Sequence, residues 1–264
     1  MPHVTSKDGT SIAYERQGTG PAVILVTGGL DDGSENAPLA TELAGHFTVF
    51  NYARRGRGES GDTLPYALKR EIEDIDALVA EAGGSAHLYG VSSGGALVLE
   101  AAAAGLEADR LAVYEVPYMV AEDAVRLWQD YVQHVRTALT DGRRGDAIEL
   151  FMRVAGSSEE DIAGAKSSSF WSGLEALAHT LAYDAACLGC GPPPMIRLGT
   201  IAQPTLVATG GGAALFEEAA DAIAASLPRA ERRTLEGQGH VVDPKALAPV
   251  LVRFFDAKEI ERPS

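Results

Sequence analysis

The sequence predicts an α/β fold, in which helices cover a mostly parallel β-sheet, and three observations lead to this class. Segments with strand character at residues 22–26, 47–52, 85–89 and 111–116 alternate with segments of helical pattern, as in parallel-sheet proteins. The segment 22–26 (AVILV) is apolar throughout, as expected of a strand buried on both faces. Hydrophobic residues make up 46% of the 264 and charged residues 22%, so the composition is that of a globular protein with a sizeable core.

The first segments predict a hairpin that precedes the parallel strands. Residues 4–6 and 11–16 are separated by a turn that contains Asp8-Gly9, a dipeptide typical of tight turns between paired strands. A helix is expected at residues 68–82, after the strand at 47–52. In total we expect eight strands, at residues 4–6, 11–16, 22–26, 47–52, 85–89, 111–116, 204–209 and 231–235.

From residue 118 to about residue 200 the alternation stops, and only helical segments follow one another. Helices are expected at residues 124–139, 146–154 and 171–186. Gly191-Pro192-Pro193-Pro194, which is expected to start no helix, would be the linker back to the sheet. A helical insertion between strands six and seven of one sheet suggests a lid over the strand ends, where such folds bind ligands. We therefore expect a core of residues 1–117 and 201–264 and a lid of residues 118–200.

The pentapeptide Gly90-Val91-Ser92-Ser93-Gly94 is the most informative motif in the chain. It follows a β-prone segment and precedes the apolar helix-forming segment 95–101. A strand, a sharp turn and a helix in this order are what a nucleophile elbow requires. The flanking residues must be small because strand and helix approach closely there, and glycine or serine occupies these positions. Ser92 is therefore the candidate nucleophile.

An activated serine needs a base within hydrogen-bonding distance, and His240 is the leading candidate. It lies just after the last expected strand and before a helix that begins at Asp243-Pro244. The alternative is a histidine in a surface loop without a catalytic role. The remaining histidines fit less well because they fall at the N-terminus, at a helix end or inside expected helices and strands: His3, His46, His87, His134 and His179.

No carboxylate directly follows the strand at 204–209, where an acid that orients His240 would first be sought. The segment after the strand at 204–209 reads Gly210-Gly211-Gly212-Ala213-Ala214, and its first carboxylates are Glu217 and Glu218, in an expected helix. Glu115 stands at the end of the preceding strand. A charged residue that ends an apolar strand is costly unless it is paired, and pairing with His240 would offset that cost. The alternative is a glutamate that reaches solvent.

The tetrahedral intermediate that forms when a serine attacks a carbonyl group also needs hydrogen-bond donors directed at its oxyanion. Two backbone amides are expected to supply them, that of Ser93 after the nucleophile and that of Gly29 after the strand at 22–26. Gly28 is the alternative by one position. A tight turn without a catalytic role would explain the same glycines.

Two other motifs are interpreted as structural. Gly56-Arg57-Gly58-Glu59-Ser60-Gly61 matches G-x-G-x-x-G, with Asp76 twenty residues after Gly56. A dinucleotide site needs these glycines to open a helix at once, whereas Pro65 delays the helix and Asp76 falls inside it. Asp243 is expected to cap the last helix because proline follows it.

Charge and cysteine content restrict the partners and the location. The formal net charge is −15, which argues against nucleic acid as a partner because phosphate binding needs a basic face. We expect no signal peptide, no membrane span, a cytoplasmic location and two reduced thiols at Cys187 and Cys190. The C-x-x-C lacks further ligands for zinc, and neither a metal nor a cofactor is expected. The sequence does not decide between a monomer and a homodimer.

These motifs together resemble the α/β-hydrolase superfamily, from Val4 to Phe255. The resemblance rests on residues 26–29 (VTGG), 55–60 (RGRGES), 90–94 (GVSSG) and 239–240 (GH). It implies an α/β-hydrolase fold with Ser92 as nucleophile, His240 as base, and the amides of Gly29 and Ser93 as the oxyanion hole. The loop at 55–60 looks like a structural signature of that fold.

Two positions depart from the common pattern of the superfamily. Thr27 stands where many members carry histidine, and the usual acid position is empty. The second departure is similar to the zearalenone-hydrolysing lactonases, in which a glutamate after the sixth strand completes the triad. Glu115 matches that position.

The function expected is hydrolysis of a carboxylic ester or lactone of a small apolar molecule through an acyl-enzyme. The alternative is a ligand-binding protein or a non-hydrolytic biosynthetic cyclase on the same scaffold, because fold alone does not decide activity. Aromatic residues of the expected lid would supply an apolar pocket, although most of them are expected to be ordinary core: Trp128, Tyr131, Phe151, Phe170, Trp171 and Tyr183.

Overall fold

A computed structural model describes residues 1–257 and contains one eight-stranded sheet with the strand order β1-β2-β4-β3-β5-β6-β7-β8. The strands are β1 (His3–Thr5), β2 (Ser11–Gln17), β3 (Ala22–Val26), β4 (Thr48–Tyr52), β5 (His87–Val91), β6 (Leu111–Tyr114), β7 (Thr205–Gly211) and β8 (Ala230–Gln238). Strand β2 is antiparallel to β1 and β4, and all other neighbours are parallel. The eight expected strands and the α/β-hydrolase fold are thereby confirmed.

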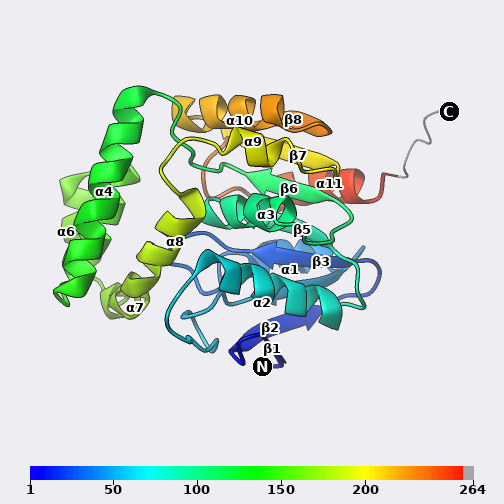
Figure 1. Ribbon diagram of the computed structural model, residues 1–264, viewed down its shortest axis with the longest axis horizontal. Helices are drawn as coiled ribbons and strands as arrows, with labels where there is room; N and C mark the ends of the chain where they lie inside the picture. The colour runs from blue at the N-terminus through cyan, green and yellow to red at the C-terminus, as the bar shows by residue number, and fades with distance from the viewer. Residues whose placement is uncertain (258–264) are drawn as a thin grey trace.

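Helices cover both faces of this sheet (Figure 1). Apolar side chains alternate along the strands, so that Val23 and Leu25 of β3 face one core and Ile24 and Val26 face the other. The first core is closed by α1 (Ala37–Leu43) and α11 (Pro244–Phe255), and the second by α2 (Leu68–Glu81), α3 (Ser93–Ala103) and α10 (Ala214–Ser226). Asp243 accepts a hydrogen bond from the Lys245 amide at 2.9 Å, which confirms its role as the cap of α11.

All regular elements between β6 and β7 are helices, and we call residues 118–200 the helical insertion. It contains α4 (Glu122–Thr140), α5 (Arg144–Val154), α6 (Glu159–Lys166), α7 (Trp171–Leu177), a 3₁₀ turn η1 (Ala178–Thr180), α8 (Leu181–Leu188) and α9 (Met195–Leu198). Helices α4, α6, α7 and α8 gather at one side of the sheet, on the left in Figure 1. Helix α8 packs against α3.

Three details of the insertion differ from the sequence prediction. The single helix expected at residues 171–186 is divided by η1, where Thr180 donates its hydroxyl hydrogen bond to the Leu177 carbonyl. Helix α6 was not expected, and it is stabilised at its start by a capping box between Ser158 and Asp161. Helix α9 begins directly after Pro194, although the sequence predicts no helix start there. A proline is compatible with this position because it suits the first turn of a helix.

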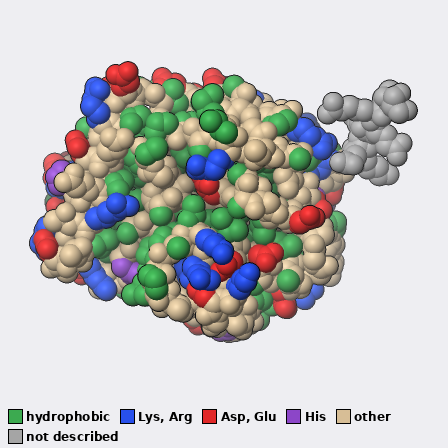
Figure 2. Space-filling model, in the orientation of Figure 1, with side chains coloured by type: hydrophobic (Ala, Val, Ile, Leu, Met, Phe, Trp, Pro, Cys, Tyr) green, Lys and Arg blue, Asp and Glu red, His purple; other side chains and the backbone are tan. Residues whose placement is uncertain are grey.

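The surface carries charges of both signs. On the face shown in Figure 2, basic side chains lie among acidic ones. Arg70 and Lys69 of α2, for example, both pair with Glu73, at 2.7 and 3.7 Å.

The two cysteines are both free thiols, with Cys187 buried and Cys190 exposed. Within residues 1–257, no helix combines the length and the apolar character needed to cross a bilayer.

Candidate active site

Ser92 lies at the sharp turn between β5 and α3. Its φ and ψ are 54° and −128°, a backbone conformation that costs energy for any residue with a side chain and is typical of functional sites. A Cβ on Gly90 would lie 2.5 Å from the Gly94 carbonyl oxygen, and one on Gly94 would lie 2.4 Å from the Thr27 carbonyl oxygen. Only glycine at these two positions lets strand and helix approach this closely, so the geometry is that of a nucleophile elbow.

The register of the sheet brings Glu115 next to Ser92. Val91 of β5 pairs with Tyr114 of β6, so Ser92 and Glu115 are the next positions on neighbouring strands. The Ser92 amide donates to the Tyr114 carbonyl at 3.0 Å. Glu115 also has a positive φ, 46°. Ser92 and Glu115 therefore both occupy strained backbone positions where their strands end.

Glu115 and His240 are in direct contact. His240 Nδ1 lies 2.8 Å from Glu115 Oε2, and the Glu115 side chain is 3% exposed. A proton carried by Nδ1 and donated to this carboxylate leaves Nε2 as the acceptor, which is the tautomer a general base requires. The ring is also stacked on Phe216 of α10, with 4.8 Å between centroids and 8° between planes.

The glycine segment at the end of β7 binds Glu115 instead of supplying the acid. The Gly210 amide donates to Glu115 Oε1 at 2.9 Å, so each oxygen of this buried carboxylate has a partner. The Tyr114 hydroxyl donates to the carbonyl of Gly239 at 2.7 Å, next to His240. Glu217 lies in α10 as expected and pairs with Arg232.

The candidate oxyanion loop passes beside the elbow. A Cβ on Gly28 would lie 3.1 Å from the Ser92 Cβ and 3.7 Å from its Oγ. A Cβ on Gly29 would lie 3.2 Å from Asp184 Oδ2. The structure therefore brings Ser92 and Ser93 close to the two glycines, and it joins Glu115 to His240 by a direct hydrogen bond. Among residues 1–257 no direct hydrogen bond joins Ser92 to His240; such contacts often shorten only when substrate binds.

The arginines of the short basic cluster are internal. Arg54, Arg55 and Arg57 are at most 1% exposed. Arg55 forms a bidentate ion pair with Asp74, at 2.7 and 2.8 Å, and a further pair with Asp8 at 3.0 Å. The loop from residue 56 to residue 61 closes through a hydrogen bond from the Gly56 amide to the Gly61 carbonyl. Helix α2 begins only at Leu68, so this loop has no helix N-terminus for a phosphate and is structural.

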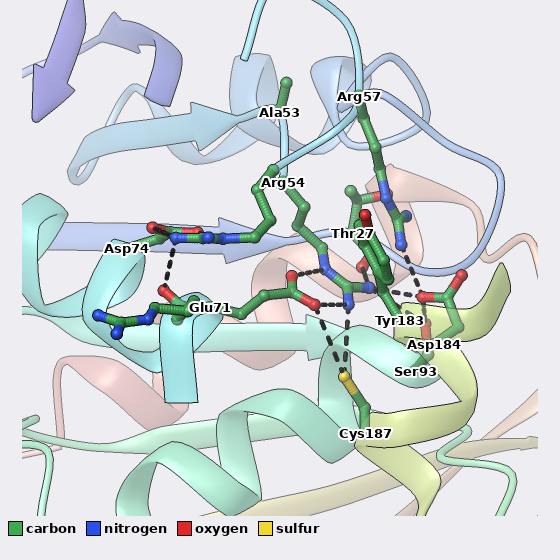
Figure 3. Close-up of polar contacts among 12 residues, drawn as sticks. Thr27, Ala53, Arg54, Arg57, Glu71, Asp74, Ser93, Tyr183, Asp184 and Cys187 are labelled. Atoms are coloured by element: carbon green, nitrogen blue, oxygen red, sulfur yellow. Dashed lines mark hydrogen bonds and ion pairs between the residues drawn. The ribbon is translucent and has the colours of Figure 1, made fainter. Parts of the chain in front are cut away.

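Sequence reasoning missed Asp184 of α8, whose side chain lies beside those of Arg54 and Arg57 (Figure 3). Its Oδ1 accepts hydrogen bonds from Arg54 at 2.8 Å, from Arg57 at 2.7 Å and from the Ser93 hydroxyl at 2.7 Å. Burial raises the pKa of Asp184, but the charges of Arg57 and Arg54 outweigh burial and hold the pKa below its ordinary value. The available signal was an acidic residue in the otherwise apolar segment 181–188 (LAYDAACL).

Arg54 lies between two carboxylates, with Glu71 on one side and Asp184 on the other (Figure 3). Its guanidinium binds Glu71 in bidentate fashion at 2.6 and 2.8 Å. It also donates to Cys187 Sγ at 3.4 Å. Burial raises the pKa of the Cys187 thiol well above its usual range, so this cysteine is a packed thiol with little thiolate character.

Two surface hollows lie away from these residues. One, of about 400 Å³, is lined by His134 and Arg143 among others, between α4 and α5. The second, of about 350 Å³, is lined by Glu42 and Lys245 among others, between α1 and α11. Neither is lined by a candidate catalytic residue, so the candidate site rests on the backbone geometry at Ser92 and on the Glu115–His240 contact.

Comparison with known proteins agrees with the fold. The sequence model of the alpha/beta hydrolase family matches residues 23–250. The crystal structure of an alpha/beta hydrolase from Sphaerobacter thermophilus is 47% identical, covers 96% of this chain and 100% of its own, and has a TM-score of 0.88. The enol-lactonase from Burkholderia xenovorans is 20% identical, with 97% and 100% coverage and a TM-score of 0.72, a likeness of fold.

A curated relative matches a shorter region. The uncharacterized hydrolase YraK of Bacillus subtilis is 32% identical over 96 residues, and the match spans 35% of this chain and 35% of that protein. The match to the family model includes the elbow and His240, and the Sphaerobacter structure is similar over nearly the whole chain. The chain belongs to the alpha/beta hydrolase family.

Proposed function

We propose that this alpha/beta hydrolase cleaves a carboxylic ester or lactone of a small apolar molecule through an acyl-enzyme, with Ser92, His240 and Glu115 as its triad. The observation that carries the proposal is the 2.8 Å contact between His240 Nδ1 and Glu115 Oε2. Ser92 directly follows β5, and Glu115 directly follows the neighbouring strand β6. The acid after the sixth strand would be the arrangement of the zearalenone-type lactonases.

In this mechanism the Ser92 Oγ attacks the substrate carbonyl carbon, and His240 Nε2 accepts its proton. Glu115 holds the ring and stabilises the imidazolium that forms. The amides of Gly29 and Ser93 donate to the oxyanion of the tetrahedral intermediate. When the intermediate collapses, the imidazolium gives its proton to the leaving alkoxide, and the acyl group remains on Ser92. Water, deprotonated by His240, then releases the carboxylic acid and restores the serine.

The helical insertion, residues 118–200, would act as the lid over this site. Its helix α8 reaches the elbow through the hydrogen bond between Ser93 and Asp184. The enol-lactonase and the hydrolase among the similar structures are consistent with ester or lactone cleavage. A non-hydrolytic role is favoured by one observation, the absence of a carboxylate from residues 210–214. The Gly210 hydrogen bond to Glu115 weighs against that role, because it gives this glycine segment a part in holding another acid.

A panel of chromogenic esters and macrocyclic lactones, assayed with wild type and Ser92→Ala, tests the proposal. We expect turnover of at least one class by wild type and a loss of about 10⁴-fold or more in Ser92→Ala, as expected when a triad nucleophile is removed. Tight binding of these compounds without turnover by wild type would instead support a ligand-binding protein.

A further inference from the structure

We propose that Asp184, contributed by the helical insertion, is a positioning residue that orients both candidate oxyanion-hole amides. The inference rests on the proposed function. It concerns one carboxylate oxygen, Asp184 Oδ1, which accepts hydrogen bonds from Ser93 and from Arg57. Each of these two residues is linked to a different donor of the oxyanion hole. Asp184 is 5% exposed and lies in α8, far along the chain from both.

The first link is direct. Ser93 is the first residue of α3, and its amide is the donor that follows the nucleophile. The Ser93 hydroxyl donates to Asp184 Oδ1 at 2.7 Å and accepts from Arg54 at 3.3 Å. The side chain of Ser93 is thus fixed from both sides, and its backbone at the start of α3 is fixed with it.

The second link passes through Arg57. Arg57 Nη2 donates to Asp184 Oδ1 at 2.7 Å. Arg57 Nη1 donates to the Gly28 carbonyl oxygen and also, at 3.3 Å, to the Asp31 carbonyl oxygen. The Gly28 carbonyl and the Gly29 N–H belong to one planar trans peptide unit, so they point in opposite directions. Holding the carbonyl therefore sets the direction of the Gly29 N–H. Without Arg57, two consecutive glycines would allow this peptide to rotate.

The charges of Arg54 and Arg57 hold the Asp184 carboxylate in place. Despite burial, Arg57 and Arg54 hold the pKa of Asp184 below its ordinary value, so the carboxylate is an anion at neutral pH and its hydrogen bonds are charge-assisted. Arg54 is held in turn by Glu71. Asp184 Oδ2 has no hydrogen-bond partner among the described residues and lies 3.2 Å from the position that a Cβ on Gly29 would occupy. The carboxylate is thus packed directly against the loop that it orients through Arg57.

The test uses three variants of the full chain. Asp184→Asn removes the charge, Arg57→Met removes the link to Gly28, and Ser93→Ala removes the hydroxyl but keeps the amide. Misdirecting an oxyanion donor should lower kcat by about 10- to 100-fold in Asp184→Asn and Arg57→Met, somewhat less than the loss of a donor, while KM stays within about threefold. The Ki of a trifluoromethyl ketone, whose adduct with Ser92 carries an oxyanion, should rise in proportion to the loss of kcat/KM.

Tyr66→Phe is the matched control. It removes the hydroxyl that donates to Glu71 and to the Tyr183 carbonyl of α8, so it disturbs the same charged cluster without contacting Asp184, Arg57 or Ser93. We expect its kcat and its ketone Ki to stay within twofold of wild type. Hydrogen exchange of residues 26–34 gives a readout that needs no catalysis, and it should be faster in Asp184→Asn and Arg57→Met but not in Tyr66→Phe.

The outcomes separate the two proposals. If wild type turns over esters or lactones and all three variants keep its kcat and ketone affinity, the positioning role is wrong and the proposed function stands. If wild type shows neither turnover nor reaction with the ketone, the proposed function is wrong, and unchanged exchange in residues 26–34 would overturn the positioning role as well. Should Asp184→Asn fail to fold, Arg57→Met and Ser93→Ala each test one of the two links.

Discussion

Glu115 Oε2 and His240 Nδ1 lie 2.8 Å apart although 125 positions separate them in the chain. The carboxylate is buried at the end of β6, and the imidazole lies in the exposed loop after β8. Parallel strands that share one sheet have their carboxyl ends at the same edge, which is how residues so distant in sequence come into contact. The contact with Glu115 uses His240 Nδ1 and fixes the orientation of the ring. It leaves the other ring nitrogen, Nε2, for a proton acceptor role.

Glu115→Gln should lower kcat by about 10³- to 10⁴-fold, because an amide at this position favours the wrong imidazole tautomer and cannot stabilise the imidazolium. Steady-state kinetics with the best ester or lactone measures the change. Glu217→Gln is the control, since Glu217 pairs with Arg232 of β8, and it should keep nearly full activity. The assignment of the acid is wrong if Glu217→Gln loses activity while Glu115→Gln retains it.

Gly210→Ala should reduce both activity and stability. A Cβ there would lie 2.1 Å from the Gln238 carbonyl oxygen and 2.8 Å from the Tyr114 hydroxyl, so the strand must move and its amide must leave Glu115. Overpacking of this kind costs about 1–3 kcal/mol of unfolding free energy, measurable by denaturant titration. In Gly212→Ala the added Cβ would meet, among residues 1–257, only the Gln238 carbonyl oxygen, at 3.8 Å. Equal effects of the two substitutions would contradict this account.

The buried Arg54 should matter far more for stability than an exposed arginine with similar partners. Arg54→Met leaves the buried Glu71 carboxylate without its bidentate partner and should lower the unfolding free energy by about 3–5 kcal/mol. Arg153 also binds two carboxylates, at 2.6 and 3.2 Å, but it lies at the surface. Because exposed ion pairs contribute little, Arg153→Ala should leave the unfolding midpoint nearly unchanged. Comparable losses in the two variants would contradict the prediction.

His87 should make the fold less stable in mild acid. It is 7% exposed in β5 and stacks on Phe255, with 4.7 Å between ring centroids. Burial lowers its pKa below the ordinary 6.5, Asp109 and Asp256 act against this shift, and Arg110 adds to it. The unfolded chain therefore takes up a proton first, so the unfolding free energy should fall as the pH drops below about 6.5 and level off below the folded pKa.

The measurement is the unfolding free energy of wild type and His87→Phe between pH 5 and 8 (a range set by the ordinary histidine pKa of about 6.5). The phenylalanine keeps a ring against Phe255 but carries no titratable group. The difference between the two proteins should be constant above pH 7 and change below it. A difference that does not vary with pH would show that His87 is not the source.

Much of the core could be predicted from the sequence because the signals are local. The apolar segment 22–26, the glycines around Ser92 and the Asp243-Pro244 cap each report their own backbone environment. Glu115 could be selected because a charge that ends a buried strand needs a partner. The pairing of Asp184 with Arg57 could not be found this way, since it joins residues 127 positions apart and depends on how α8 packs on α3.

The insertion was less predictable for a related reason. Residues 171–186 have one continuous helical pattern, but the chain turns at η1, where Ala178 and Thr180 become fully buried. Tertiary packing decides such breaks. The segment contains no proline, and its one glycine, Gly173, lies within α7 and not at the break. The order of strands along the sheet likewise follows from packing, although its parallel character could be predicted from the alternation.

The most direct test of the triad is covalent labelling with a fluorophosphonate, followed by intact-mass measurement and peptide mapping. We expect one adduct per chain, on Ser92, formed with loss of fluoride. We also expect no labelling of Ser92→Ala and labelling slowed by orders of magnitude in His240→Ala. An unmodified wild-type protein, or an adduct on a different residue with Ser92 untouched, would contradict the central claim that this serine is an activated nucleophile.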